Sequence, residues 1–465
     1  MKSGIQEYLS YFVHSLFLST KGFAVNTIKY NKKFYRVLGE LEESQWYSLE
    51  QLKELQDTKL RKLIVHAYEN VPYYNKLFKK HGIRPHDIQG TEDLKKIPLL
   101  SKEALRANPQ DFIAANINRK LLAPGWTTGT TGAPINALRS RESITFENAV
   151  LWRQKRWAGI DVGCRKVAVW GTIWDHVIVP SSIKSPPFWR KNIADHQLLF
   201  SYYHMSDDTL PLYFKKIEEF GPDFIEGFPS TILTLSNFLK RQNEIFSVKS
   251  IFTSSEPLYD VHRNEIEERF KTKVFDHYGQ AERVAAASDC PEHRGLHVHP
   301  EYGVLEIIKE NRDASPGERG EIIGTGLNNY AMPLIRYSTG DIAQFATEPC
   351  PCGRKMPLLQ SIDGRKADSI ITPDGRVIPG GGLMGAFHGI ENVKKSQIVQ
   401  EDINNIIVRI VRNQNERGVE TDRLISNLKK CIGEDVRIGI DITDSLADGD
   451  TIKHRWVVSK VKIDG

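Results

Sequence analysis

The chain has 465 residues, of which 40% are hydrophobic and 26% are charged, a composition typical of a globular protein and unlike that of a disordered or fibrous one. There are 63 Lys and Arg against 58 Asp and Glu, and the net charge of +5 is too small to predict the dense basic face of a dedicated nucleic-acid binder. No uncharged apolar run reaches the roughly 18 residues of a membrane span, which excludes a polytopic membrane protein.

The five cysteines are too few for a disulfide scaffold, and the close spacing of Cys350 and Cys352 suits metal binding better than disulfide bonding. The N-terminus lacks the order of a signal peptide, so a reducing, cytoplasmic location is expected. The apolar stretch Ile5–Val25 is interpreted as a helix packed on its own domain. The alternative is an amphipathic helix that lies on a membrane or on a partner.

The first 120 residues are predicted to be mostly helical. A mixed apolar and charged run over Leu49–Val71 ends before Pro72, because a residue that precedes proline disfavours the helical conformation. A short helix restarts at Tyr73 and runs to Lys80. Ser101 is the candidate N-cap of a further helix.

From residue 121 onward, short apolar strands alternate with helical stretches. The expected strands are Lys166–Trp170, Phe224–Gly227, Ser250–Thr253 and Lys273–Asp276, and the expected helices are Asp207–Phe220, Thr231–Gln242 and Val261–Phe270. This alternation predicts an α/β fold with a largely parallel sheet and helices on its faces. A turn-rich β region is predicted at Gly303–Phe345.

The last hundred residues carry a pattern of their own. Strands are predicted at Gln397–Gln400, Ile406–Val411 and Val436–Asp441, with a helix at Thr421–Gly433. We therefore predict three parts: a helical N-terminal part (1–120), a core (121–363) and a compact α+β domain (364–465), with the boundary at Asp363.

The sharpest local signal is the run Thr127-Thr128-Gly129-Thr130-Thr131-Gly132-Ala133-Pro134. Its glycines let the backbone turn tightly and present N–H groups to an anion, and its threonine hydroxyls can donate to phosphate oxygens. It is not a Walker loop, since no Gly-Lys-Ser/Thr follows. A plain surface turn would have the same composition.

Three further motifs carry candidate ligand groups. Glu282 follows a predicted strand, where a carboxylate can hold a Mg²⁺ ion that bridges phosphates. Asp341, in a glycine turn, can accept two hydrogen bonds from ribose hydroxyls. Arg365 can reach a ribose or a phosphate beside a glycine hinge. Taken singly, each motif is also typical of an exposed turn or a charged linker.

Taken in order, the Thr/Gly loop, Tyr278-Gly279-Gln280-Ala281-Glu282, the Tyr337–Asp341 motif and Gly364-Arg365 resemble the adenylate-forming superfamily of acyl-CoA ligases, luciferases and peptide-synthetase adenylation domains. The segments His66–Tyr74 and Ile97–Lys102 resemble phenylacetate–CoA ligase-like proteins, with the CapK-like capsular polysaccharide members as the best match. The resemblance implies a large adenylate-forming domain with mixed sheets and a small mobile C-terminal α+β domain.

The resemblance also implies roles for single residues. The ATP- and AMP-binding set is Thr127, Thr128, Gly129, Thr130, Thr131, Ser255, Glu256, Pro257, His277, Tyr278, Gly279, Gln280, Asp341 and Arg365. The catalytic set is Lys453, Glu282 and Arg365. Glu282 would bind Mg²⁺, and the mobile ammonium of Lys453 would neutralise charge between the attacking carboxylate and the α-phosphate. Trp170, Glu226 and Gly227 would line the acyl pocket.

A structural metal site is a further candidate. Three thiolates, from Cys290, Cys350 and Cys352, and one imidazole would complete a closed tetrahedral Zn²⁺ site. The imidazole could come from His293, His297 or His299, and the resemblance favours His297. Buried free cysteines are the alternative.

The function implied by the resemblance is a two-step ligase that uses ATP and Mg²⁺. A small carboxylic acid would be adenylated with release of pyrophosphate. The acyl group would then pass to an amine, a sugar hydroxyl, coenzyme A or a carrier thiol, in surface polysaccharide biosynthesis. The alternatives are an acyl-CoA ligase for an aryl acid and a non-catalytic nucleotide-binding scaffold. No nucleic-acid partner is expected, and a homodimer and a peripheral membrane contact are left open.

Overall fold

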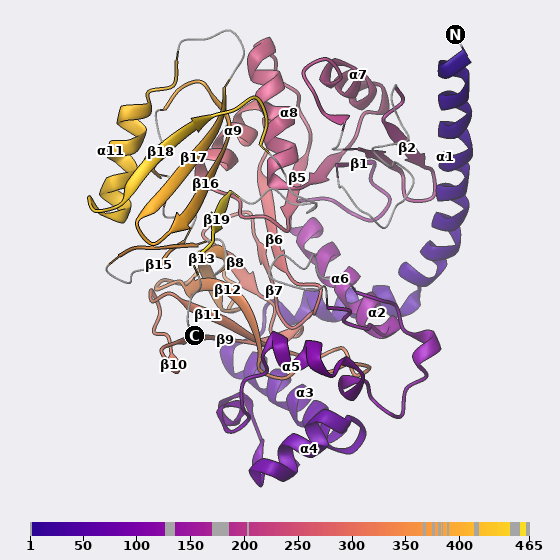
Figure 1. Ribbon diagram of the computed structural model, residues 1–465. Coiled ribbons are helices and arrows are strands. Elements are labelled where there is room, and N and C mark those ends of the chain that lie inside the picture. Colours follow the sequence, from indigo (N-terminus) through magenta and orange to yellow (C-terminus); the bar gives the residue numbers. More distant parts are fainter. Residues whose placement is uncertain are drawn as a thin grey trace.

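A thirteen-stranded mixed sheet forms the centre of the computed structural model, and a separate four-stranded sheet forms a smaller C-terminal unit (Figure 1). The α/β fold expected from the sequence is confirmed. The structure describes residues 2–125, 135–169, 186–201, 204–365, 369–373, 377–379, 383, 385–387, 390–412, 418–446 and 456–461. No helix within these residues combines the length and apolarity that crossing a membrane requires.

The N-terminal part is helical, as predicted. Its α-helices are α1 (Lys2–Lys29), α2 (Lys32–Ser44), α3 (Leu49–Asn70), α4 (Pro72–His81) and α5 (Lys102–Ala107). Short 3₁₀ turns follow at Pro85–Asp87, Thr91–Lys96, Pro109–Phe112 and Arg119–Leu121. Ser48 and Gln51 form a capping box at the start of α3, and Ser101 caps α5 as expected. Gly82, at φ 67°, ends α4 in the left-handed conformation that glycine adopts readily.

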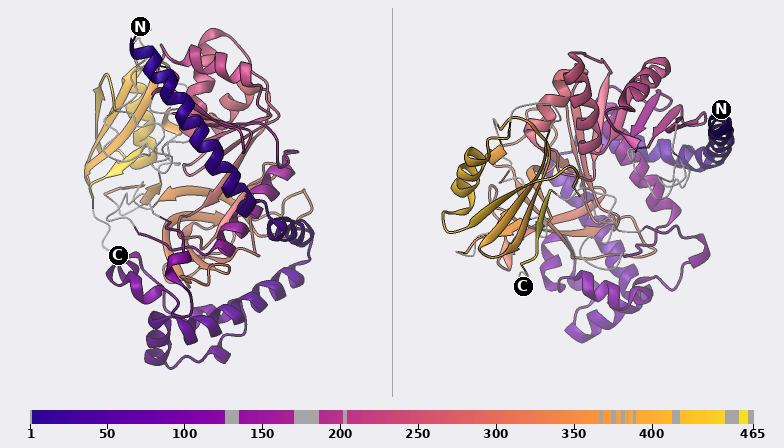
Figure 2. Two further views of the ribbon diagram at one scale, coloured as in Figure 1. Left: turned by 90° about the vertical axis from the view of Figure 1, so that its right-hand side faces the viewer. Right: turned by 45° about the horizontal axis from the view of Figure 1, so that its top comes forward.

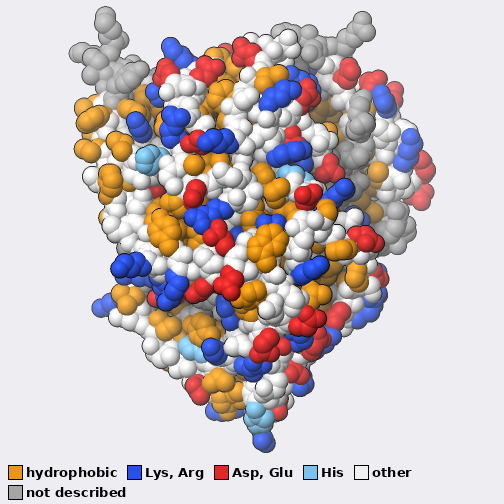
Figure 3. Space-filling model, turned by 180° about the vertical axis from the view of Figure 1, so that it is seen from behind, with side chains coloured by type: hydrophobic (Ala, Val, Ile, Leu, Met, Phe, Trp, Pro, Cys, Tyr) orange, Lys and Arg blue, Asp and Glu red, His pale blue; other side chains and the backbone are white. Residues whose placement is uncertain are grey.

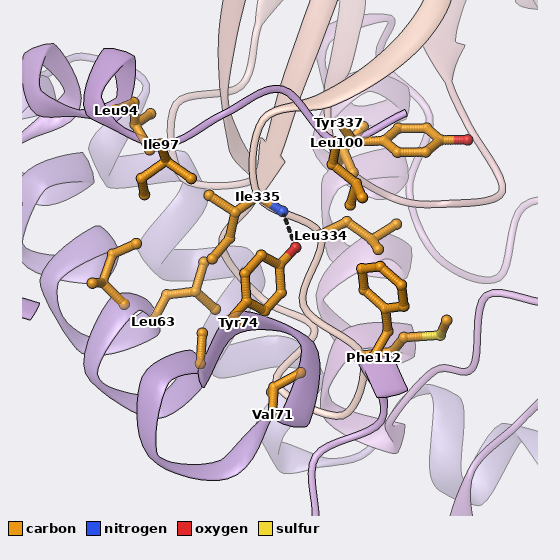
Figure 4. Packing of buried hydrophobic residues seen from close by; sticks show 14 of the residues in the cluster. Leu63, Val71, Tyr74, Leu94, Ile97, Leu100, Phe112, Leu334, Ile335 and Tyr337 are labelled. Atoms are coloured by element: carbon orange, nitrogen blue, oxygen red, sulfur yellow. Dashed lines mark hydrogen bonds between the residues drawn. The ribbon is translucent and has the colours of Figure 1, made fainter. Parts of the chain in front are cut away.

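A buried apolar cluster joins these helices to the β region. Tyr74 of α4 lies among Leu63, Ile97 and Phe112, and its hydroxyl oxygen accepts a hydrogen bond from the N–H of Ile335 at 2.8 Å (Figure 4). The bond satisfies the one polar atom that burying a tyrosine ring would otherwise leave without a partner. The helical part is thereby fixed to the segment that leads into the Asp341 motif.

The parallel half of the large sheet holds the predicted strands. It consists of β1 (Lys166–Val169), β4 (Phe224–Gly227), β5 (Ser250–Ser254) and β6 (Val274–Gly279), with β3 (Gln197–Phe200) and β2 (Trp189–Asn192) at its edge. Its helices are α6 (Arg141–Trp157), α7 (Leu210–Phe220), α8 (Pro229–Gln242) and α9 (Asp260–Phe270). Successive residues of a strand point to opposite faces. Phe224 therefore packs in the cluster with α2 and α6, and Ile225 in the cluster with α7 and α8.

The antiparallel half continues the same sheet beyond β6. Its strands are β7 (Ala286–Asp289), β8 (Leu296–Val298), β9 (Gly303–Lys309), β10 (Arg312–Asp313), β11 (Gly320–Gly326), β12 (Tyr337–Phe345) and β13 (Leu358–Arg365). A two-stranded sheet follows, made of β14 (Ser369–Ile371) and β15 (Val377–Pro379). The predicted boundary at Asp363 falls inside β13, because Arg365 still pairs with Asp341 of β12. The domain limits therefore stay a prediction.

The C-terminal unit has the predicted β-β-α-β order and one further strand. Its elements are the 3₁₀ turn Gly385–Phe387, β16 (Val393–Asp402), β17 (Asn405–Arg412), α11 (Thr421–Ile432), β18 (Arg437–Ile442) and β19 (Val457–Ser459). The strand order is β18-β17-β16-β19. Apolar residues one helical turn apart, Leu424, Leu428 and Ile432, pack α11 onto this sheet. Figures 1 and 2 show the unit to one side of the large body, away from α1.

Candidate functional site

Three parallel strands end side by side and place the predicted nucleotide residues at one edge of the sheet. β4 pairs with β5, and β5 pairs with β6, so that Gly227 lies opposite Thr253 and Ser254 lies opposite His277. The segments 255–257 and 280–282 follow the ends of β5 and β6 directly. The crevice outside the carboxyl ends of parallel strands is where open α/β sheets bind ligands.

The segment after β5 makes a tight turn toward α8. Ser255 has a φ of 72°, a left-handed conformation that is uncommon outside glycine. The Oε2 atom of Glu256 accepts a hydrogen bond from the N–H of Ser230 at 3.1 Å, near the start of α8. Ser255 and Pro257 are exposed, and Glu256 is half-buried. Their contact with adenine stays a prediction.

The structure brings Tyr278 and Asp341 together from β6 and β12. The Tyr278 hydroxyl donates to Oδ2 of Asp341 at 2.7 Å, and the side-chain amide of Gln280 donates to the Tyr278 oxygen. Burial, together with the Asp341 carboxylate, holds the pKa of Tyr278 well above its usual value, so the phenol stays a donor. Two motifs that are 63 residues apart therefore form one hydrogen-bonded group.

Glu282 is tied to the same strand. The Tyr337 hydroxyl donates to its Oε1 atom at 2.7 Å. Burial and the Glu282 carboxylate raise the pKa of Tyr337, which keeps this hydroxyl protonated. We did not single out Tyr337 as a site residue from the sequence, although it opens the motif that ends at Asp341. Its position at the start of that motif was the feature of the sequence that could have pointed to it.

Arg139 is a second residue that the sequence analysis missed. Ala123 and Arg139 form a bridge across the base of the segment 126–134, and the Arg139 Nη2 atom donates to the carbonyl of Ala281 at 2.7 Å. A Cβ atom on Gly125 would lie 2.2 Å from the Arg139 Nε atom, so only glycine leaves room for this guanidinium. Burial and the neighbouring Arg283 lower the pKa of Arg139 to about 10, and it remains a cation.

Several predicted residues lie outside the described part of the chain: Thr127, Thr128, Gly129, Thr130, Thr131, Trp170 and Lys453. The described residues 125 and 135 mark where the Thr/Gly loop leaves and returns, beside the Ala281 turn. Arg365 is placed only by its backbone, which pairs with Asp341. The roles of all these residues stay predictions.

His277 points away from the strand-end edge. Its Nδ1 atom lies 2.9 Å from the Ser288 hydroxyl, which also lies 2.7 Å from Nε2 of His299. Burial lowers the pKa of His277 to about 4, so the imidazole is neutral. Because its side chain is held in this network, His277 would contact a nucleotide through its backbone, and that contact stays a prediction.

The Glu226 side chain lies on the face of the sheet that α6 covers. Its carboxylate pairs with Lys155 at 3.1 Å and with Lys166 at 3.9 Å. Burial alone would raise the pKa of Glu226, but the two lysines outweigh burial and lower it to about 2. The neighbouring Gly227 packs closely, since an added Cβ would lie 2.9 Å from Ile232. These ion pairs were not foreseen, and the acyl contact of Glu226 and Gly227 stays a prediction.

A second group of candidate ligands lies at the far end of β7. The donor atoms of Cys290, His297, Cys350 and Cys352 all lie within 4.8 Å of one another. The Cys290 and Cys350 Sγ atoms are 3.6 Å apart, and Cys352 Sγ is 3.3 Å from His297 Nε2. These separations approach the edge of about 3.8 Å of a tetrahedron with Zn–S bonds of about 2.3 Å.

The alternative histidines are engaged elsewhere. His293 Nδ1 lies 2.9 Å from the Asp289 carboxylate, and His299 lies against Ser288 and Arg153. Burial and the nearby Arg354 lower the pKa of His297 to about 4, which leaves the neutral imidazole that a metal ligand must be. The geometry thus groups His297, of the three, with the cysteines.

Comparisons with known proteins identify several that are similar to this chain. The CapK C-terminal domain family matches residues 370–460. Protein CapK of Staphylococcus aureus is 27% identical over 453 residues, which cover 96% of this chain and 97% of CapK. A phenylacetate-coenzyme A ligase of Escherichia coli strain K12 is 29% identical over 351 residues, covering 73% of this chain and 77% of that ligase.

Solved structures show the same fold. The crystal structure of 2-hydroxyisobutyryl-CoA ligase in the postadenylation state superposes with a TM-score of 0.70 at 19% identity, covering 89% of this chain and 91% of that one. The strand-end site and its four-stranded C-terminal unit therefore sit in the architecture of an acyl-CoA ligase. The chain is therefore similar to CapK along nearly its whole length and to phenylacetate-coenzyme A ligases over about three quarters of it, and it has the fold of the adenylate-forming acyl-CoA ligases.

Proposed function

We propose that the protein is an ATP-dependent ligase that activates a carboxylic acid as an acyl-adenylate and transfers the acyl group to an amine, hydroxyl or thiol. The observation that supports it best is that β12 meets the carboxyl end of β6, where its Asp341 is bonded to Tyr278 and its Tyr337 to Glu282. Adenylation of an acid by ATP needs one carboxylate that binds the ribose and another that holds Mg²⁺ near the phosphates.

In the first step, an oxygen of the substrate carboxylate attacks the α-phosphorus of ATP, the bond to the β-phosphate oxygen breaks, and pyrophosphate leaves. Asp341 would accept hydrogen bonds from the ribose hydroxyls and so fix the α-phosphate in line with the acid. Mg²⁺ held at Glu282 would neutralise charge on the phosphate oxygens. Tyr337 orients that carboxylate, and Arg139 adds a cation beside the loop that would hold the phosphates.

In the second step, the acceptor attacks the acyl carbon, loses its proton, and AMP leaves with the electron pair of the broken bond. We propose that the C-terminal unit rotates about the 363–367 segment between the steps and moves Lys453 out of the site. Lys453→Ala should then abolish adenylate formation and spare attack on a pre-made adenylate. Equal loss of both half-reactions would contradict this role.

ATP–pyrophosphate exchange against a panel of amino acids, hydroxy acids, arylacetates and sugar acids tests the proposal directly. Exchange with one acid that is strongly reduced in Asp341→Asn and retained in the surface control Glu318→Gln would support it. Failure to bind ATP at all would overturn it and favour a non-catalytic scaffold. The pathway we propose is surface polysaccharide biosynthesis in the cytoplasm, because the chain resembles CapK along 96% of its length.

An acyl-CoA ligase for an aryl acid is the second candidate, because phenylacetate-coenzyme A ligases match over 73% of the chain. This candidate narrows the acid to an aryl acid and the acceptor to the thiol of coenzyme A. Release of AMP from the adenylate that depends on coenzyme A would select this second candidate. Release that is unchanged by coenzyme A would select an amine or hydroxyl acceptor.

We also propose that Cys290, His297, Cys350 and Cys352 bind a structural Zn²⁺. Four soft donors with near-tetrahedral spacing leave no open position for catalysis. The metal would link the β7–β8 hairpin to the turn that joins β12 and β13. Elemental analysis of the purified protein should give about one zinc per chain. Cys352→Ser should lose it, and Cys164→Ser, a free cysteine outside the cluster, should keep it.

A further inference from the structure

Helix α1 is the outermost element of the large body, and its inner side is fixed (Figures 1 and 2). The Ser15 and Ser19 hydroxyls accept hydrogen bonds from the N–H groups of Lys191 and Ile193, at 3.1 and 3.0 Å. The Asn26 amide donates to the Ala194 carbonyl at 2.8 Å. These contacts set the rotation of the helix about its axis and so define which side faces outward.

The outward side of α1 is apolar. Six large side chains on it are each more than half exposed: Leu9, Phe12, Val13, Leu16, Phe17 and Phe23. Two threonines interrupt them, but the Thr20 hydroxyl donates to the Phe17 carbonyl at 2.9 Å and the Thr27 hydroxyl to the Ala24 carbonyl at 2.7 Å. The face thus presents methyl groups and rings, without a polar group that needs water.

No charge falls on this face. Between Leu9 and Thr27 the only Asp, Glu, Lys or Arg is Lys21, which the helical repeat of 100° per residue places about 140° away from Leu16. Seen from behind, the molecule shows hydrophobic side chains along its left edge, where α1 lies (Figure 3). A second copy of the face would therefore meet it without like charges in opposition.

The spacing of the face is that of a helix–helix seam. Its central positions alternate steps of four and three residues: Leu9, Val13, Leu16, Thr20, Phe23 and Thr27. An average of 3.5 residues is the repeat at which two helices keep one stripe in contact. β-branched residues occupy one set of positions and Leu or Phe the other, the combination that favours two-stranded pairs.

The exposed area matches what a dimer of moderate stability needs. With more than half of each side chain exposed, the six residues present on the order of 600 Å² per copy, because an aromatic side chain buries 150–250 Å². Two such faces would bury about 1,200 Å², which is within the range of specific protein interfaces. A patch of this size is at the upper limit for a monomer.

We propose that α1 is a dimerisation helix, which pairs through this face with α1 of a second copy of the chain. The same residues then serve on both copies, as in any two-fold interface. Leu16, at the middle of the stripe, lies close to its counterpart whether the two helices run parallel or antiparallel. This surface is separate from the strand-end site, and the inference does not depend on the proposed activity.

Sedimentation equilibrium of the full chain and of two variants tests the proposal. The wild type should have twice the mass of the chain, and Leu16→Glu should be monomeric because two buried carboxylates would face each other. Val25→Glu is the matched control, since Val25 is exposed on α1 but points away from the stripe; it should stay dimeric. Circular dichroism should show all three folded, because Leu16 is 57% exposed in the single chain. The monomeric variant should lose only the stabilisation that dimerisation adds.

A second variant gives a positive signal. Leu16→Cys should form a cross-linked dimer with a short bis-maleimide, whereas Val25→Cys and the wild type, with its native cysteines, should not. A wild type that is monomeric at tens of micromolar, or a Leu16→Glu variant that still dimerises, would overturn the proposal. Flotation of monomeric wild type with phosphatidylglycerol vesicles, lost in Leu16→Glu, would assign the face to a lipid surface instead.

Discussion

His277 and Tyr278 are neighbours on β6, yet they belong to different chemical regions. Tyr278 faces the strand-end site, where it, Glu282 and Asp341 are half-buried, and hydrogen bonds join Tyr278 to Asp341 and Tyr337 to Glu282. His277 faces a fully enclosed polar network that runs through Ser288 to His299. Groups that are half-exposed can exchange partners with a ligand, whereas enclosed groups are held by the fold. A polar residue within a binding motif is therefore not by itself a ligand contact.

The enclosed network ends on a buried ion pair. Arg153 is fully buried, and its Nη1 atom lies 2.7 Å from Oε1 of Glu301, which is 3% exposed. The guanidinium also donates to the carbonyl of Leu41, and Ser44 bonds the same carboxylate. The network thus ties α6 and α2 to the antiparallel half of the sheet, on the face opposite the site.

Breaking this network should have the largest effect. Arg153→Met leaves the Glu301 charge buried without its partner and should lower the free energy of unfolding by about 3–5 kcal/mol. Urea denaturation measures the loss. Arg156→Met, on the same helix but in half-exposed ion pairs with Glu42 and Asp161, should cost less than about 1 kcal/mol. Equal losses would mean that the two regions do not differ as described.

The Glu226 cluster should make stability depend on pH. Its pKa is lowered in the folded state from 4.5 to about 2, so its contribution is complete above the unfolded pKa and is lost as pH falls from about 4.5 to 2. The shift corresponds to on the order of 3 kcal/mol. The difference in unfolding free energy between the wild type and Glu226→Gln should therefore be large at pH 7 and shrink steadily below pH 4.5. A difference that does not change with pH would contradict the ion-pair assignment.

Changes in the site should do the opposite, with a large effect on activity and a small one on stability. Asp341→Asn removes a charge-assisted hydrogen bond to the ribose, worth about 1.5–3 kcal/mol, and should lower kcat/KM for ATP in exchange by about 10–100-fold. Its unfolding free energy should change by less than about 1 kcal/mol, because Asp341 is half-buried. A loss of stability that accounts for the lost activity would place Asp341 with the enclosed network.

The smallest effect is expected at Gly125. In Gly125→Ala the new Cβ displaces the Arg139 guanidinium without removing its charge. The KM for ATP should rise several-fold, by about 1 kcal/mol, with kcat little changed. Arg139→Ala should raise KM further. Gly159→Ala is a control for general effects of the substitution, because no heavy atom lies within 4 Å of its added Cβ. With a φ of 75°, Gly159→Ala also strains the backbone more than Gly125→Ala does, so it controls for backbone strain. An unchanged KM would show that Arg139 serves only to brace the Ala281 turn.

Much of the fold follows from local sequence. The strands β4 and β5 and the helices α8 and α9 were predicted to within a few residues, because apolar runs of four are bounded by signals such as Gly221-Pro222. The antiparallel continuation beyond β6 was not foreseen as part of the same sheet. Pairings such as β13 with β8 join segments about sixty residues apart, and no local pattern encodes them.

The candidate site was also predictable from the sequence only in part. Tyr278, Glu282 and Asp341 could be proposed because each lies in a motif, and the structure brings them together. Arg139 could not, since an arginine after a loop is ordinary until the Ala281 turn is placed against it. The resemblance favoured His297 for the metal cluster, but His297 and His299 are two residues apart, so strand alternation alone does not separate them. The choice rests on the placement of Cys350 and Cys352, about fifty residues later, beside His297.

Helix α1 also closes one end of the thirteen-stranded sheet. β2 is the last strand at that end, and its outward N–H groups at Lys191 and Ile193 are taken by Ser15 and Ser19. The other end is β10, only two residues long and charged at Arg312 and Asp313. An open strand edge is a template for uncontrolled association with other chains. Removing the first thirty residues would therefore uncover such an edge, and the shortened chain should aggregate even though its strand-end site is untouched.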